Sequence, residues 1–281
     1  MNRVIILITR FFKLLRSVFR LMSLLLWFFV MFIFFVFSKI FNLRIGKKIP
    51  RVFHKGVLKI LNIKISLFGE LDINKPGLII SNHASWLDII ILSSLTNTSF
   101  IAKSEIASWP IIGFLAKLQN TLFIERKAQR VANQKFQILE YLSKGNKLVL
   151  FAEGTSSDGN RVLNFKSSLF SVGETEKGKL GNFIFQPVTI CYSGLNGLPI
   201  SRSQRPIIAW WGNMNLFSHL WNVFSLSSVN ITVTAHEPIQ NVQDRKSMSK
   251  IAWRQVTYGM GNALSGHPNP VRLEKIMNGC I

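Results

Sequence analysis

The sequence predicts an α/β fold, a largely parallel sheet flanked by helices, preceded by an N-terminal hydrophobic membrane-anchor helix. Three observations support this prediction. An uncharged apolar stretch lies near the N-terminus, at 21–38. Beyond residue 70, short apolar runs alternate with longer segments of helical periodicity, as in an α/β domain. Lys and Arg are dense in the first 69 residues, where Asp and Glu do not occur. We therefore expect an anchor over 1–50 and one α/β domain over 51–281.

The apolar stretch has 18 uncharged residues, at the short end of the ~17–25 that cross a bilayer as a helix. Before it, Arg10, Lys13, Arg16 and Arg20 recur every three or four residues among apolar ones, which predicts a basic amphipathic helix on the membrane surface. Basic residues also follow the stretch, so the two flanks do not set an orientation. A single span and a hairpin or monotopic anchor both fit; a buried helix of a soluble core fits less well.

The charge is concentrated beside the anchor. Of 34 Lys and Arg, 13 precede Glu70, and the other 21 face all 13 acidic residues, which leaves +8 of the total +21 for the remainder. Cations beside an apolar anchor favour an anionic lipid surface. No nucleic-acid-binding motif accompanies them, so nucleic acid is not an expected partner. The two cysteines form neither a disulfide framework nor a Cys-x-x-Cys pair for zinc or redox chemistry.

The elements of the domain follow from apolar runs and their boundaries. Gly77–Ser81 reads as a buried strand, and the next segment as a helix that ends before Thr96. Helices are expected next at 110–119 and 128–143, and an aromatic helix at 215–224. Further strands are expected at 100–103, 121–124, 147–151, 183–190, 207–211 and 229–235.

His83 and Asp88 are the strongest candidates for chemistry. His83 directly follows a predicted buried strand, where α/β folds expose functional side chains. On one straight helix a separation of five rotates two side chains apart by roughly 140°. The pair meets only if the chain turns between strand and helix, with Ser85 as a possible helix cap. A carboxylate on one imidazole nitrogen would leave the other free to accept a proton. In the structural alternative, Asp88 supports the helix start and His83 is a polar loop residue.

Three further segments accompany this pair. Glu153, Gly154 and Thr155 follow another predicted strand, in a loop rich in hydroxyl and amide donors. Arg126 follows a third strand, in the segment Phe-Ile-Glu-Arg, and its guanidinium suits phosphate recognition. Pro187 and Val188 form the last segment, with Pro187 expected at a strand start or edge.

Taken in order, these four segments resemble the 1-acyl-glycerol-3-phosphate (lysophosphatidate) acyltransferases of the glycerolipid acyltransferase superfamily. The resemblance covers roughly residues 75–195 and is strongest at Asn82-His83 followed by Asp88. It implies a membrane-bound O-acyltransferase in which His83 is the general base and Asp88 orients it. Arg126 would contact the acceptor's phosphate, and Glu153, Gly154 and Thr155 would help to bind the acceptor.

The resemblance also implies the substrates. A fatty acyl group would pass from acyl-ACP or acyl-CoA, the co-substrate, to the free hydroxyl of the lysophospholipid 1-acyl-glycerol-3-phosphate, giving phosphatidic acid in phospholipid biosynthesis. No cofactor or metal is implied. The expected location is a bacterial inner membrane, with the domain on its cytoplasmic face.

Two departures from the family pattern bear on the acceptor. Ala152 and Ser156 stand where the family usually has Pro and Arg around Glu-Gly-Thr, and a second Arg often found three residues after Arg126 is absent. Another lysolipid, such as lyso-ornithine lipid, is therefore the alternative acceptor. A non-enzymatic basic membrane tether is the alternative from another class, since it would need the charges but not His83 or Asp88.

Overall fold

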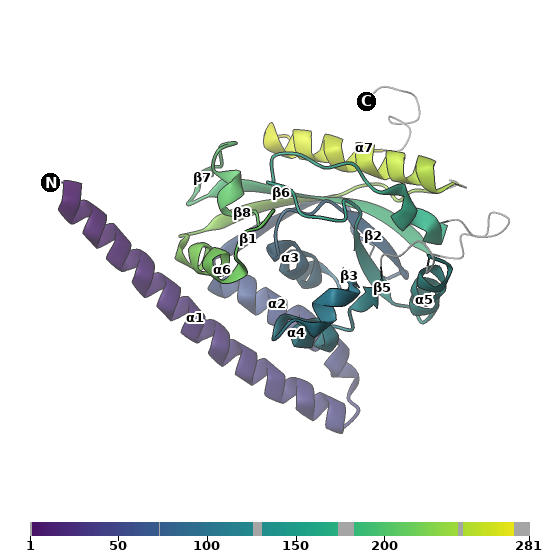
Figure 1. Ribbon diagram of the computed structural model, residues 1–281, viewed down its shortest axis with the longest axis horizontal. Coiled ribbons are helices and arrows are strands. Elements are labelled where there is room, and N and C mark those ends of the chain that lie inside the picture. Colours follow the sequence, from purple (N-terminus) through teal and green to yellow (C-terminus); the bar gives the residue numbers. More distant parts are fainter. Residues whose placement is uncertain (1, 73, 126–130, 174–182, 241–243, 273–281) are drawn as a thin grey trace.

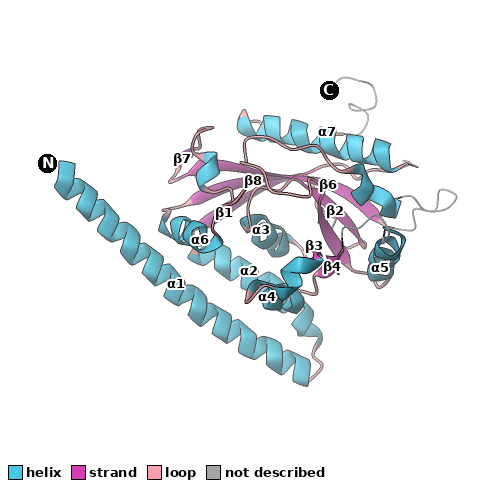
Figure 2. Cartoon of the chain, in the orientation of Figure 1, coloured by secondary structure: helices cyan, strands magenta, loops and turns pink. Residues whose placement is uncertain are grey.

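The computed structural model describes residues 2–72, 74–125, 131–173, 183–240 and 244–272. It confirms the predicted α/β architecture (Figures 1 and 2). A twisted sheet separates two helical layers, with α2, α3 and α6 on one side and α7 on the other. The long N-terminal helix α1 runs outside the first layer. The helices are α1 (Asn2–Ile40), α2 (Ile49–Ile60), α3 (Leu87–Leu95), α4 (Ile112–Leu118), α5 (Val131–Ser143), α6 (Leu216–Ser225) and α7 (Arg245–Leu264).

Within the described residues, eight strands form one sheet in the order β1-β8-β6-β2-β5-β3-β4, with β7 paired to β6. The strands from β6 to β4 run parallel to one another, and β8 is antiparallel to β6. The strands are β1 (Ile63–Phe68), β2 (Gly77–Ser81), β3 (Ser99–Lys103), β4 (Leu122–Ile124), β5 (Lys147–Phe151), β6 (Ile184–Leu195), β7 (Leu198–Pro199) and β8 (Val229–Ala235). Parallel pairing places the carboxyl ends of β2 and β5, Ser81 and Phe151, side by side.

The sheet has an apolar core on each face. On one face, Ile79, Val149 and Ile231 pack with residues of α2, α3 and α6. On the other, Leu78 and Leu148 pack with residues of α5 and α7. Because both faces of the central strands are covered, their sequences are continuous apolar runs, which made β2 and β5 recognisable in the sequence.

The N-terminal segment differs in one respect from the prediction. The expected surface helix and the apolar stretch form one continuous helix, α1, which is long and apolar enough to cross a membrane. Arg20, expected among cations on the membrane surface, is instead buried, and its guanidinium donates to the Phe224 carbonyl oxygen (3.0 Å) at the end of α6. Arg16 likewise donates to the Ser225 carbonyl oxygen (3.0 Å). The last carbonyl groups of a helix have no N–H partner within that helix, and here the guanidinium groups of Arg16 and Arg20 donate to them.

Two local predictions are wrong. The strand expected at 207–211 is absent, because the chain forms a 3-10 turn at Arg205–Ile207 and then irregular backbone. Pro187 lies inside β6, opposite Ile80, rather than at a strand start. The Pro187 carbonyl oxygen accepts from the His236 N–H (3.0 Å) just beyond the last pair of β6 and β8. Pro187 has no N–H to return that bond, and the Gln186 side-chain amide donates to the His236 carbonyl oxygen instead, at 3.0 Å.

Candidate active site

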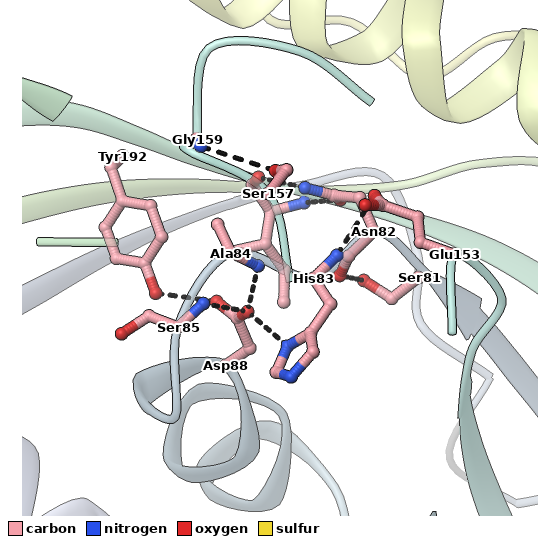
Figure 3. Close-up of polar contacts among 11 residues, drawn as sticks. Ser81, Asn82, His83, Ala84, Ser85, Asp88, Glu153, Ser157, Gly159 and Tyr192 are labelled. Atoms are coloured by element: carbon pink, nitrogen blue, oxygen red, sulfur yellow. Dashed lines mark hydrogen bonds and ion pairs between the residues drawn. The ribbon is translucent and has the colours of Figure 1, made fainter. Parts of the chain in front are cut away.

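The chain turns sharply between β2 and α3, and this turn brings His83 and Asp88 together (Figure 3). Nδ1 of His83 lies 2.8 Å from Oδ2 of Asp88. Asp88 is in the first turn of α3, and His83 is in the turn before it. The predicted meeting of the two side chains across a strand-to-helix junction is confirmed; the catalytic role of the pair stays a prediction. The suggested cap at Ser85 is wrong, since no side chain caps the start of α3.

Asp88 is a buried carboxylate with partners for both oxygens. Besides His83, Oδ2 accepts hydrogen bonds from the backbone N–H groups of Ala84 (2.7 Å) and Ser85 (2.8 Å). Oδ1 accepts from the Tyr192 hydroxyl at 2.6 Å. Burial, and then the neighbouring Asp88 charge, raise the pKa of Tyr192 well above its usual value, so Tyr192 remains a donor. Asp88 is 1% exposed, and these four donors replace the water that its charge loses.

The imidazole of His83 has one occupied and one open nitrogen. The carboxylate of Asp88 only accepts hydrogen bonds, so Nδ1 carries the proton and Nε2 presents its lone pair. The side chain is 19% exposed, and Nε2 has no hydrogen-bond partner among the described residues. The ring stacks on Phe151 at the end of β5, with centroids 4.0 Å apart and planes at 14°. This packing leaves Nε2 as a positioned proton acceptor beside an apolar wall.

The turn is fixed to both neighbouring strands. The Asn82 amide donates to the carbonyl oxygen of Ile190 in β6 and accepts from its N–H, each at 2.9 Å. The Ser157 N–H, in the loop after β5, donates to the His83 carbonyl oxygen at 2.8 Å (Figure 3). The turn is therefore held from two sides, which restricts the orientation of His83.

Glu153 lies behind this turn. Its carboxylate oxygen Oε1 accepts from the backbone N–H of His83 at 3.2 Å, and its side chain is buried. Burial raises the pKa of Glu153 to about 8, against the lowering effect of the His83 N–H, and the nearby Asp88 charge adds to the rise. The described contact is with the His83 backbone, so the geometry supports a positioning role; the expected contact with an acceptor stays a prediction.

The other expected binding residues have different outcomes. Gly154 has a φ of 74°, a conformation that glycine adopts without strain, and turns the chain directly after Glu153. Thr155 is exposed in the same loop. Arg126 lies outside the described residues. Thus Glu153 and its loop adjoin His83 as expected, and the contribution of each residue to binding stays a prediction.

We expect Glu153 to make the stability of the fold depend on pH. Between about 4.5, the usual pKa, and about 8, the unfolded chain releases a proton that folded Glu153 retains. Folding stability therefore falls as the pH rises through this window, by up to ~1.4 kcal/mol per pH unit. Glu153→Gln removes this titration. Thermal unfolding from pH 5 to 8 should show the variant gaining stability relative to the wild type as the pH rises.

The matched control is Glu140→Gln, which changes an exposed glutamate on α5. Its unfolding temperature should follow that of the wild type throughout the pH range. Parallel curves for Glu153→Gln and the wild type would contradict a proton held on Glu153.

The sequence did not predict the roles of two residues in the site. Tyr192 lies two residues past the strand expected at 183–190 and was not singled out as a site residue; the pairing of β6 with β2 brings it to Asp88. Asn82 was recognised as a motif residue, but its paired bonds with Ile190 depend on the same register. A tyrosine inside an apolar strand was the one available signal, because a buried hydroxyl usually finds a partner.

A buried carboxylate that orients an imidazole with one open nitrogen is the arrangement of a general base, so the fold and site define a candidate enzyme that activates a hydroxyl. Comparison with known proteins agrees. Residues 51–190 match the model of the family described as Acyltransferase. The chain is 36% identical over 229 residues to the lyso-ornithine lipid O-acyltransferase of Brucella abortus, covering 80% of this chain and 86% of that one.

Two further proteins are similar. The 1-acyl-sn-glycerol-3-phosphate acyltransferase of Neisseria meningitidis is 31% identical over 181 residues, covering 64% of this chain and 67% of that one. The crystal structure of the 1-acyl-sn-glycerophosphate (LPA) acyltransferase from Thermotoga maritima has the same fold, with a TM-score of 0.60 and 20% identity over 88% of this chain and 97% of that one. The chain belongs to the glycerolipid acyltransferase family and is an O-acyltransferase.

Proposed function

We propose that this protein transfers a fatty acyl group from an acyl thioester to the free hydroxyl of a lyso-ornithine lipid, with His83 as general base. The observation that supports the chemistry best is the 2.8 Å contact between His83 Nδ1 and Asp88 Oδ2, with Nε2 left open. No resident cofactor or metal enters the proposal. The donor is the thioester of acyl carrier protein or of coenzyme A.

The proposed reaction follows from this geometry. Nε2 of His83 takes the proton of the acceptor hydroxyl as its oxygen attacks the thioester carbonyl carbon. The carbon–sulfur bond then breaks, an ester forms, and the departing thiolate receives the proton from His83. Asp88 stabilises the imidazolium in between, because its carboxylate lies on the opposite ring nitrogen. The protein contributes a base and an orientation, so no acyl-enzyme is required.

The choice of acceptor is supported by the relatives and by one residue. The Brucella relative, named for lyso-ornithine lipid, matches at higher identity and over more of the chain than the Neisseria relative, named for 1-acyl-sn-glycerol-3-phosphate. An ornithine headgroup is an amino acid and carries no phosphate. Ser156 replaces the arginine that usually follows Glu-Gly-Thr in lysophosphatidate acyltransferases, which removes a cation suited to phosphate.

Lysophosphatidate, with phosphatidic acid as the product, is the second candidate. The Neisseria relative favours it, as does Arg126, a residue type suited to a phosphate group. The two acceptors differ in the charge they present to the site, so direct competition distinguishes them.

The test is an assay of the purified protein with acyl-ACP and acyl-CoA against a panel of lysolipids, with products identified by mass spectrometry. We expect kcat/KM for lyso-ornithine lipid to exceed that for lysophosphatidate by about tenfold or more, the factor for one well-placed ionic contact. A preference for lysophosphatidate would overturn the acceptor assignment alone. Absence of acyl transfer to every lysolipid would overturn the proposed reaction.

We further propose that α1 lies along a membrane surface rather than spanning it, with the domain on the cytoplasmic face of a bacterial inner membrane. Between Arg16 and Phe32, roughly 24 Å of helix, α1 contacts the domain. Trp27 Nε1 donates to the Phe53 carbonyl oxygen (3.0 Å), and Phe32 packs against Phe114. If α1 crossed the bilayer perpendicular to its plane, the part of the domain packed along α1 would lie in the hydrocarbon layer. To test the orientation, a protease is added to membrane vesicles. We expect it to cleave the domain in inverted vesicles and not in right-side-out vesicles.

A further inference from the structure

The segment from the end of the 3-10 turn to the end of α6 presents a strip of large apolar side chains. From Pro206 to His236 the chain has no Asp, Glu, Lys or Arg, although the protein carries a net charge of +21. Phe217 is 72% exposed, more than most aromatic side chains of the domain. The exposed strip consists of Trp211, Met214, Phe217 and Trp221. A surface this apolar indicates contact with a partner other than water.

Helix α6 divides into an inner and an outer face. His219, Val223 and Phe224 point into the protein, whereas Phe217 and Trp221, four residues apart, share the outer face. Packing of the domain therefore does not explain the two outer aromatic residues. Tryptophan and phenylalanine on the outer side of a short helix are typical of a helix that enters the boundary between lipid headgroups and acyl chains.

The strip adjoins the apolar helix α1. Helix α6 lies beside α1, on the same side of the sheet as α2 and α3 (Figure 1). The guanidinium groups of Arg16 and Arg20 hold the end of α6 against α1. Phe12 and Phe19, both exposed on α1, stand four residues before and three residues after Arg16, and so on the same side of the helix. The lipid surface proposed for α1 therefore continues onto α6.

The strip also lies beside the catalytic turn. Trp86, two residues before Asp88, donates its indole N–H to Nδ1 of His219 in α6 at 3.0 Å. The backbone N–H of Trp210, next to the strip, donates to the Ala84 carbonyl oxygen at 2.8 Å. Hydrogen bonds therefore connect α6 and Trp210 to the turn that carries His83, which places the strip close to His83.

We propose that Trp211, Met214, Phe217 and Trp221 form a second membrane-docking surface, which inserts into the lipid boundary beside His83 and brings the site to its lipid acceptor. This inference rests on the proposed lysolipid acyl transfer. The occupant is a bilayer surface, because the strip is continuous with α1 and combines tryptophans with an absence of charge. Insertion places His83 near the depth of a lysolipid's polar part.

Fluorescence quenching tests insertion without turnover. The full-length protein is mixed with vesicles of phosphatidylcholine and phosphatidylglycerol, with or without bromine on the acyl chains. We expect brominated lipid to quench the tryptophan emission, and Trp221→Phe to remove part of that quenching. Trp253→Phe is the matched control, because Trp253 belongs to α7 and packs against the core on the opposite face of the sheet. Equal quenching in the wild type and Trp221→Phe would overturn the proposal.

Kinetics test whether the surface serves the site. Phe217→Glu should lower kcat/KM for vesicle-borne acceptor, relative to detergent-dispersed acceptor, by about tenfold, as expected for losing much of one aromatic side chain's burial. The control Phe136→Glu changes a similarly exposed phenylalanine (65%) on α5 and should leave this ratio unchanged. Equal ratios in the two variants would overturn the proposal. The proposal would also be overturned if the wild type formed a dimer in detergent, Phe217→Glu dissociated that dimer, and brominated lipid still quenched the tryptophan emission of Phe217→Glu as in the wild type. An inactive protein that retains Trp221 quenching would refute the proposed reaction, but not the docking surface.

Discussion

Replacing His83 by alanine is expected to lower kcat/KM for acyl transfer by about 10²–10⁴-fold, the usual contribution of a positioned general base. The open Nε2 is the group lost, and no neighbour on the turn offers a replacement: Asp88 is 1% exposed and fully engaged by hydrogen bonds. The fold should survive, because the His83 backbone keeps its bonds to Glu153 and Ser157. The measurement is the initial rate on the preferred lysolipid, with thermal unfolding as the check on folding.

His267→Ala is the matched control for this prediction. His267 follows α7 in an exposed turn, where Nδ1 contacts the carbonyl oxygen of Ser265. Its replacement should leave the rate within about twofold of the wild type, as surface substitutions usually do. Wild-type activity in His83→Ala would refute the general-base mechanism.

Replacing Asp88 by asparagine is expected to lower both activity and stability. The carboxylate orients His83 and also accepts from two backbone N–H groups and from Tyr192. Asparagine has the same size but one acceptor oxygen, so its amide would meet N–H groups as a second donor. We expect kcat to fall by about 10³-fold or more, because the imidazole tautomer is no longer imposed. Unfolding experiments should show a loss of about 2–4 kcal/mol from mismatched buried groups.

Tyr192→Phe separates these two effects. It removes only the hydroxyl that donates to Oδ1, and leaves the contact between His83 and Oδ2 intact. Stability should fall by about 1–3 kcal/mol, the cost of one unmet buried polar contact. The rate should fall much less than in Asp88→Asn. If the two variants lose activity equally, Asp88 acts through the stability of the turn and not through the His83 tautomer.

The central strands and the helix after β2 were predictable, because their local sequences and tertiary environments agree. Strands β2 and β5 contain continuous apolar runs at 78–80 and 148–151, as required of parallel strands covered on both faces, and polar motif residues follow them. The placement of His83 and Glu153 after the carboxyl ends of strands, and so at one edge of the sheet, followed from that pattern. Parallel neighbours of similar length end at the same edge of a sheet.

Elements at the periphery were not predictable in this way. Strand β1 lies at the edge of the sheet with only Ile63 buried, and α7 is too polar overall to show a strong apolar face. The segment at 207–211 is apolar enough for a strand, yet Ile208 and Ala209 are buried in irregular backbone beside the catalytic turn. Its apolar character reflects burial and not sheet pairing, a distinction that local sequence does not contain.

The sequence by itself determined the apolar character of the N-terminal segment, the alternation of strands and helices, and the need for a turn between His83 and Asp88. Only the tertiary structure decided what surrounds that pair. Tyr192 reaches Asp88 through the pairing of β6 with β2, and Glu153 reaches the His83 backbone through the pairing of β5 with β2. Arg20 is bound to α6 because helix packing brings together residues 204 positions apart. Local periodicity reports how one segment divides its faces between core and surroundings, whereas these contacts depend on which segments become neighbours.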